Sequence, residues 1–118
     1  EDVDFALKAW LIGDGVLHDP HASIGHRFRT DGSAYSIRST AIPVNKLRMA
    51  RTSFGDHAWD EWLARFRGLF SETEWREIWA GFSRRRRSVE KERRHVLGAR
   101  CRDEYWYAYR FGLPWPAR

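Results

Sequence analysis

The sequence predicts a mostly helical α+β fold with one strongly basic helix near the C-terminus, and three observations support this. Apolar residues recur at helical spacing from residue 56 to residue 82. Nine Lys and Arg residues against two acids lie between Arg84 and Arg102, so this window carries +7 while the whole chain carries +5. The dipeptide Asp31-Gly32, between two alternating segments, is typical of a β-hairpin.

Length and composition limit the classes of protein. With 118 residues, the chain is expected to form a single domain, with a helix and hairpin over residues 3–43 and a helical part over residues 56–111. Its single cysteine, Cys101, cannot form an internal disulfide and favours a reducing, cytoplasmic location. No apolar run is long enough to span a membrane, so no membrane partner is expected.

The N-terminal elements are a short helix and the hairpin. Residues 3–12 have an apolar side, and Gly13 and Gly15 follow as a stop. Residues 27–30 and 33–38 form the two predicted strands, and Pro43 is predicted to end the second strand. The alternation leaves three arginines on the solvent face of the hairpin: Arg27, Arg29 and Arg38.

The helical part begins after an ambiguous stretch. Residues 44–55 show no clear pattern beyond a short helix around Lys46 to Ala50. Asp56 opens a convincing amphipathic helix, and Ser71 with Glu74 forms a capping box that starts a second one. The predicted core consists of Trp59, Trp62, Leu63, Phe66, Leu69, Phe70, Trp75, Ile78, Trp79 and Phe82.

The basic stretch continues as helix towards Gly112 and Pro114, with a bend or break expected near Gly81–Ser83 or at Gly98. On a helical wheel, one side of this stretch is basic: Arg84, Arg87, Lys91, Arg94 and Arg102. Three more arginines recur every seven residues on the apolar side: Arg86, Arg93 and Arg100. Because an unpaired buried charge is costly, this second row must meet acids or phosphates unless the apolar side is exposed. Acids on neighbouring helices that are available to it are Glu61, Glu72, Glu74 and Glu77.

This pattern predicts a non-enzymatic protein that binds nucleic acid, such as a small regulator or packaging accessory. Arginine predominates over lysine, which suits bidentate contacts to phosphate. The aromatic residues between Tyr105 and Phe111 either stack on bases or fill the core beneath the helix. The predicted phosphate-binding residues are Arg84, Arg85, Arg86, Arg87, Lys91, Arg93, Arg94, Arg100 and Arg102, with Arg27, Arg29 and Arg38 of the hairpin.

Two alternatives use the same helix differently. In the first, the arginines and the C-terminal aromatics bind an acidic protein or a second copy of the chain, as in an assembly subunit. In the second, the stretch is a solvated charged helix that covers an aromatic core.

A third functional class, a metal-dependent hydrolase, is favoured least. Metal-ligand residue types gather in one loop: Asp14, His18, Asp19, His21 and His26. Their spacing matches no established site, and no cofactor is expected.

Residues 7–15 resemble the nine-residue signature of LAGLIDADG homing endonucleases. The resemblance implies that Asp14, after the helix, binds a catalytic metal. The sequence departs from that signature, because Ile12 replaces the first acid and Lys8 would lie at a tight helix interface. Only one hairpin follows where the family has two.

Overall fold

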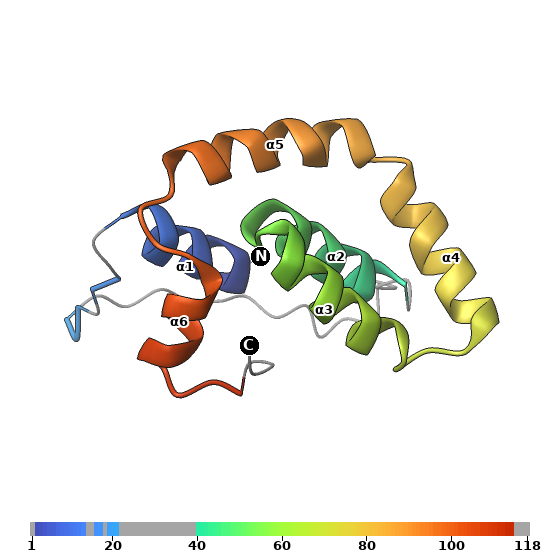
Figure 1. The fold of residues 1–118 in the computed structure, drawn as a ribbon, viewed down its shortest axis with the longest axis horizontal. Helices are drawn as coiled ribbons and strands as arrows, with labels where there is room; N and C mark the ends of the chain where they lie inside the picture. The colour runs from blue at the N-terminus through green and yellow to red at the C-terminus, as the bar shows by residue number, and fades with distance from the viewer. Residues whose placement is uncertain (1, 14–15, 18, 22–39, 115–118) are drawn as a thin grey trace.

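The computed structural model describes residues 2–13, 16–17, 19–21 and 40–114. Within these residues the chain forms the helices α1 (Asp2–Ile12), α2 (Ala41–Ser53), α3 (Asp56–Arg67), α4 (Glu72–Ser83), α5 (Arg86–Ala99) and α6 (Glu104–Arg110). Short connections join the helices from α2 to α6, and α5 lies along one edge with α6 on the opposite side (Figure 1).

The predicted α+β fold class is wrong, because the residues that the structure describes contain helices and no strand. The predicted hairpin, residues 27–38, lies outside the described residues. Pro43, predicted to end a strand, lies instead in the first turn of α2. Proline is tolerated there because the first N–H groups of a helix have no intrahelical acceptor.

The central element is α2, which packs against α1, α3, α4 and α5. Its Leu47 and Ala50 are fully buried. The approach of α4 is so close that a Cβ atom at Gly81 would lie 2.9 Å from Val44 Cγ2. Glycine at that position therefore allows α4 to lie against α2.

The predicted helices around α2 are confirmed. The helix expected over residues 3–12 is α1, which contributes Leu7 and Leu11 to the core. The Ser71–Glu74 capping box is present at the start of α4. Of the predicted core residues, Leu69 and Trp79 remain 74% and 37% exposed, and the others are buried or half-buried.

The long basic helix is broken at both of the places expected. The chain leaves α4 after Ser83 and starts α5 at Arg86, where it changes direction (Figure 1). It ends α5 at Ala99, one residue after Gly98, and Asp103 then caps α6 by accepting a hydrogen bond from Trp106 N–H. None of the helices described is both long and apolar enough to cross a membrane.

Candidate nucleic-acid interface

Arg93 points inward from α5 and stabilises the junction between α2 and α3. Its guanidinium donates to the carbonyls of Arg51 and Phe54, each at 2.5 Å, and to Asp56 Oδ1 at 2.9 Å. Only 4% of the residue is exposed. Desolvation by burial lowers the pKa of Arg93, and the nearby charge of Arg51 lowers it further. These contacts satisfy carbonyls that the end of a helix leaves without an intrahelical donor.

Arg100 binds the same junction from the other end of α5. Its Nη1 donates to the Ser53 carbonyl at 3.1 Å and to Glu104 Oε2 at 2.6 Å. Glu104 is itself buried, and its Oε1 accepts a hydrogen bond from Gly55 N–H at 3.0 Å. The end of α2 and the start of α3 are therefore held by one ion pair between a half-buried arginine and a buried glutamate.

Arg102 has the same role at the end of α1. Its Nη1 donates to the carbonyls of Gly13 at 2.6 Å and Trp10 at 3.2 Å. The guanidinium also lies 4.6 Å from the ring centre of Trp106, a cation–π contact. The backbone N–H of Cys101 donates to the Leu11 carbonyl beside it, at 3.0 Å.

These contacts show which groups are bound by the inward arginines that recur every seven residues. Two of the three arginines on the apolar side, Arg93 and Arg100, meet acids, which was one of the alternatives left open, and the third, Arg86, is exposed. In the described part of the chain those acids are Asp56 and Glu104, and none of the four glutamates expected. The i,i+4 spacing of Arg100 and Glu104 was a signal for that pair. A phosphate would have to displace internal acceptors at Arg93, Arg100 and Arg102, so contact there stays a prediction.

The two acids of α5 are also directed inward. Glu90 accepts hydrogen bonds from Arg51 of α2, at 2.8 Å and 3.3 Å, and these bonds lower the pKa of Glu90. Glu92 accepts from Lys8 of α1 at 2.5 Å. Burial alone would lower the pKa of Lys8, but its hydrogen bonds to Glu92 and Asp4 outweigh that effect and raise it. Both carboxylates are thus paired with cations of other helices.

The remaining cations of this stretch form an exposed surface, the outer basic ridge. Their side chains donate no hydrogen bond and form no ion pair to any residue that the structure describes. Glu90, four residues before Arg94, is paired with Arg51 instead. The ridge consists of Arg84, Arg85, Arg86, Arg87, Lys91 and Arg94.

The cations of the ridge lie close enough together to repel one another. Side chains three or four residues apart on a helix lie about 5–6 Å apart at Cβ. That spacing is below the Debye length of about 8 Å at physiological salt, so neighbouring charges repel one another. A chain of phosphates relieves this repulsion and releases its own condensed counterions.

The other predicted site residues are not gathered here. Arg27, Arg29 and Arg38 lie outside the described residues, as do Asp14, His18 and His26. His21 is exposed, with its backbone N–H bonded to Asp19 Oδ1 at 2.9 Å. Across the part of the chain that the structure describes, no three His, Cys, Asp or Glu residues are grouped so that they could hold a metal ion.

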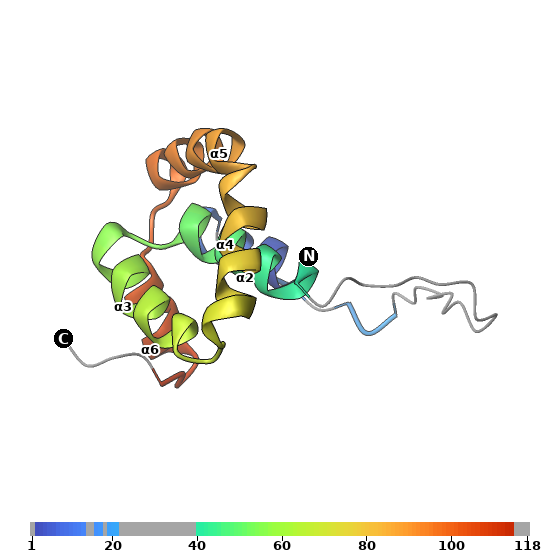
Figure 2. The ribbon, with the colours of Figure 1, turned by 90° about the vertical axis from the view of Figure 1, so that its right-hand side faces the viewer.

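The C-terminal aromatics pack mainly against α1 and the core. The Trp10 and Trp106 ring centres are 6.3 Å apart, and Tyr105 and Tyr107 pack against the core cluster. Tyr109 alone in α6 is almost fully exposed, at 90%. Figures 1 and 2 place α6 on the side of the molecule opposite α5, so its aromatics are not beside the ridge.

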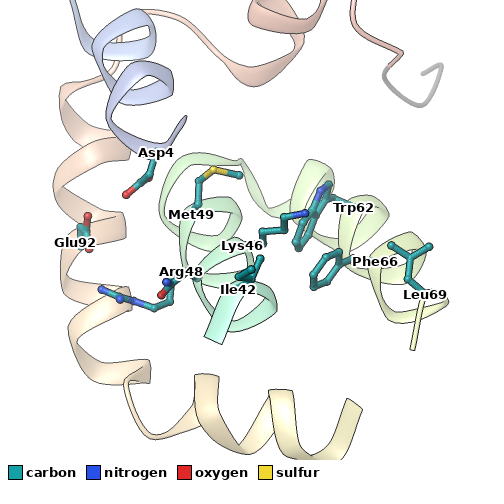
Figure 3. Close-up of a pocket in the computed structure, with 10 residues that line it drawn as sticks. Asp4, Ile42, Lys46, Arg48, Met49, Trp62, Phe66, Leu69 and Glu92 are labelled. Atoms are coloured by element: carbon teal, nitrogen blue, oxygen red, sulfur yellow. The ribbon is translucent and has the colours of Figure 1, made fainter. Parts of the chain in front are cut away.

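A separate groove of about 710 Å³ lies between α1, α2, α3 and α5 (Figure 3). Trp62 and Phe66 stack in its wall with ring centres 4.4 Å apart. The acids at its edge, Asp4 and Glu92, are both bonded to Lys8. The rest of the lining combines apolar residues with Asn45, Lys46 and Arg48, so the groove is of mixed polarity and contains aromatic residues that the ridge lacks.

Comparison with protein-family models, with curated proteins and with solved structures gives no match for this chain.

Proposed function

We propose that the protein binds nucleic acid without catalysis, through phosphate contacts made by the outer basic ridge. The observation that carries the proposal is the division of charge over α5 and the two residues before it. Both acids of this helix pair with Arg51 and Lys8, while the six cations of the ridge have no ion-pair partner among the described residues. Binding of this kind suits a small regulator or a packaging accessory.

The test is a titration of a fluorescently labelled DNA duplex of roughly 20 base pairs with the protein, at several salt concentrations between about 50 and 200 mM. The logarithm of the affinity should fall linearly with the logarithm of the salt concentration. Six phosphate contacts predict a slope of about −5, since each contributes about −0.9. Absence of binding at the lowest salt concentration would overturn the proposal.

Two triple variants separate a local site from a general effect of charge. The ridge variant carries Arg87→Gln, Lys91→Gln and Arg94→Gln, and should reduce the slope by about 2.7. The control variant removes the same charge from exposed arginines of α3, α4 and α6 and should leave the slope unchanged. Its substitutions are Arg65→Gln, Arg76→Gln and Arg110→Gln. Equal effects of the two variants would contradict a site on the ridge.

The alternative of an acidic protein partner, or of a second copy of the chain, is examined in the same experiment. Poly-glutamate replaces the duplex in one arm, and a sizing column measures the oligomeric state of the free protein. Tighter binding of poly-glutamate than of DNA at equal salt, or a stable oligomer that buries the ridge, would favour assembly over nucleic-acid binding.

A further inference from the structure

The outer face of α5 has a definite geometry. Arg87, Lys91 and Arg94 follow one another at intervals of four and three residues, and all three are exposed. The opposite face is buried through Val89, Arg93 and Val96. The three outward cations therefore form a single line along the helix, directed away from the core.

The position of α5 leaves this line open to a large ligand. Figures 1 and 2, which share a vertical axis, both show α5 as the upper edge of the molecule. Its 14 residues correspond to a length of about 21 Å at 1.5 Å per residue. A helix with side chains is about 10–12 Å wide, and the major groove of B-form DNA is about 12 Å wide. The helix is thus narrow enough for this groove, and it lies at an edge of the molecule.

The chemistry of the ridge favours a duplex over a single strand. Surfaces that bind single strands combine cations with aromatic side chains on which bases stack. The ridge contains no aromatic residue. Of the aromatics that precede it in α4, Phe82 is buried and Trp79 packs against Trp75 and Phe82, and the aromatic run of α6 lies on the other side of the molecule. A double-stranded RNA helix also fits poorly, because its major groove is deep and narrow.

We infer that α5 inserts its outer face into the major groove of duplex DNA; this rests on the proposed function. Arg87, Lys91 and Arg94 lie on the inserted face, from which their long side chains reach the phosphates of the two strands that flank the groove, while the inserted helix covers guanine N7 on the floor. Arg84, Arg85 and Arg86, around the start of the helix, contact the phosphates at its edge.

The first experiment compares three probes of equal length and matched sequence at one salt concentration: duplex DNA, duplex RNA and single-stranded DNA. Duplex DNA should bind at least about tenfold more tightly than either of the others. Equal or tighter binding of duplex RNA or of the single strand would overturn the inference and leave the proposed function standing. No binding to any of the three would overturn the proposed function itself.

The second experiment identifies the groove. Dimethyl sulfate methylates guanine at N7 in the major groove and adenine at N3 in the minor groove. Saturation of the DNA duplex with protein should protect N7 and leave N3 reactive, and Arg87→Gln with Arg94→Gln should abolish this protection. Protection of N3 alone, or of neither atom at saturation, would contradict insertion of α5 into the major groove.

Discussion

Replacement of Arg93 by methionine tests whether the inward arginines of the basic stretch stabilise the fold. Methionine keeps an unbranched apolar stem but removes the guanidinium, which donates to two carbonyls and to Asp56. Loss of a partner for a buried polar group costs about 1–3 kcal/mol, and disruption of a buried ion pair costs about 3–5 kcal/mol. The Asp56 side chain is 81% exposed, so water replaces part of that pair. We expect the free energy of unfolding to fall by about 2–4 kcal/mol.

A loss of this size is a large part of the stability of a domain, which is typically about 5–15 kcal/mol. Urea unfolding followed by tryptophan fluorescence measures it directly. The matched control is Arg94→Met at the neighbouring position, where the side chain is exposed and belongs to the ridge. That change should alter the free energy of unfolding by no more than about 0.5 kcal/mol. Equal losses in the two variants would refute the assignment of Arg93 as a structural residue.

Two further predictions concern stability. Gly98→Ala should stabilise α5 by about 0.5–1 kcal/mol, because a Cβ atom there meets nothing within 4 Å and alanine favours the helix. Gly81→Ala should instead destabilise the protein, because its Cβ atom would clash with Val44. Urea unfolding of both variants measures the two changes in the free energy of unfolding. A Gly81→Ala protein as stable as the wild type would contradict the close packing of α4 on α2. The hydrogen bonds from Arg51 lower the pKa of Glu90, so this pair stabilises the fold above the unfolded pKa of about 4.3 and loses that effect as the pH falls through the lower, folded pKa. The free energy of unfolding should therefore fall more between about pH 6 and about pH 3 for the wild type than for Glu90→Gln. An identical fall in the two proteins would contradict a stabilising role for Glu90.

Much of the helical part was predictable from local patterns. The apolar spacing in α3 and α4 and the Ser71–Glu74 capping box depend on near neighbours in the chain, and these elements were confirmed. Gly81 and Gly98 likewise indicated where the predicted basic helix is interrupted. Such patterns depend on residues that are close together in the chain, so they can be recognised in a single sequence.

The central helix α2 was not predictable in this way. Its role depends on four other helices that cover it, and Pro43 at its start was read as a strand end. The partners of the inward arginines are distant in the chain and could not be predicted from local patterns either. Arg93 and Arg51, for example, are 42 residues apart in the chain and meet only after α2 and α5 have packed together. The helical wheel placed Arg93 and Arg100 correctly, but Arg86 is exposed and Arg102 binds internal carbonyls, the reverse of their predicted sides. It also could not identify backbone carbonyls as acceptors.

We propose that neighbouring cations of α5 have separate roles: the inward ones stabilise the fold and the outward ones bind nucleic acid. The most direct test is the salt dependence of duplex DNA affinity for Arg93→Gln and Arg94→Gln, at a temperature at which both variants are folded. The two changes remove the same charge from adjacent positions. Arg94→Gln should weaken binding and reduce the salt slope by about 0.9, while Arg93→Gln should match the wild type in both. Equal reductions of the slope in the two variants would contradict the claim.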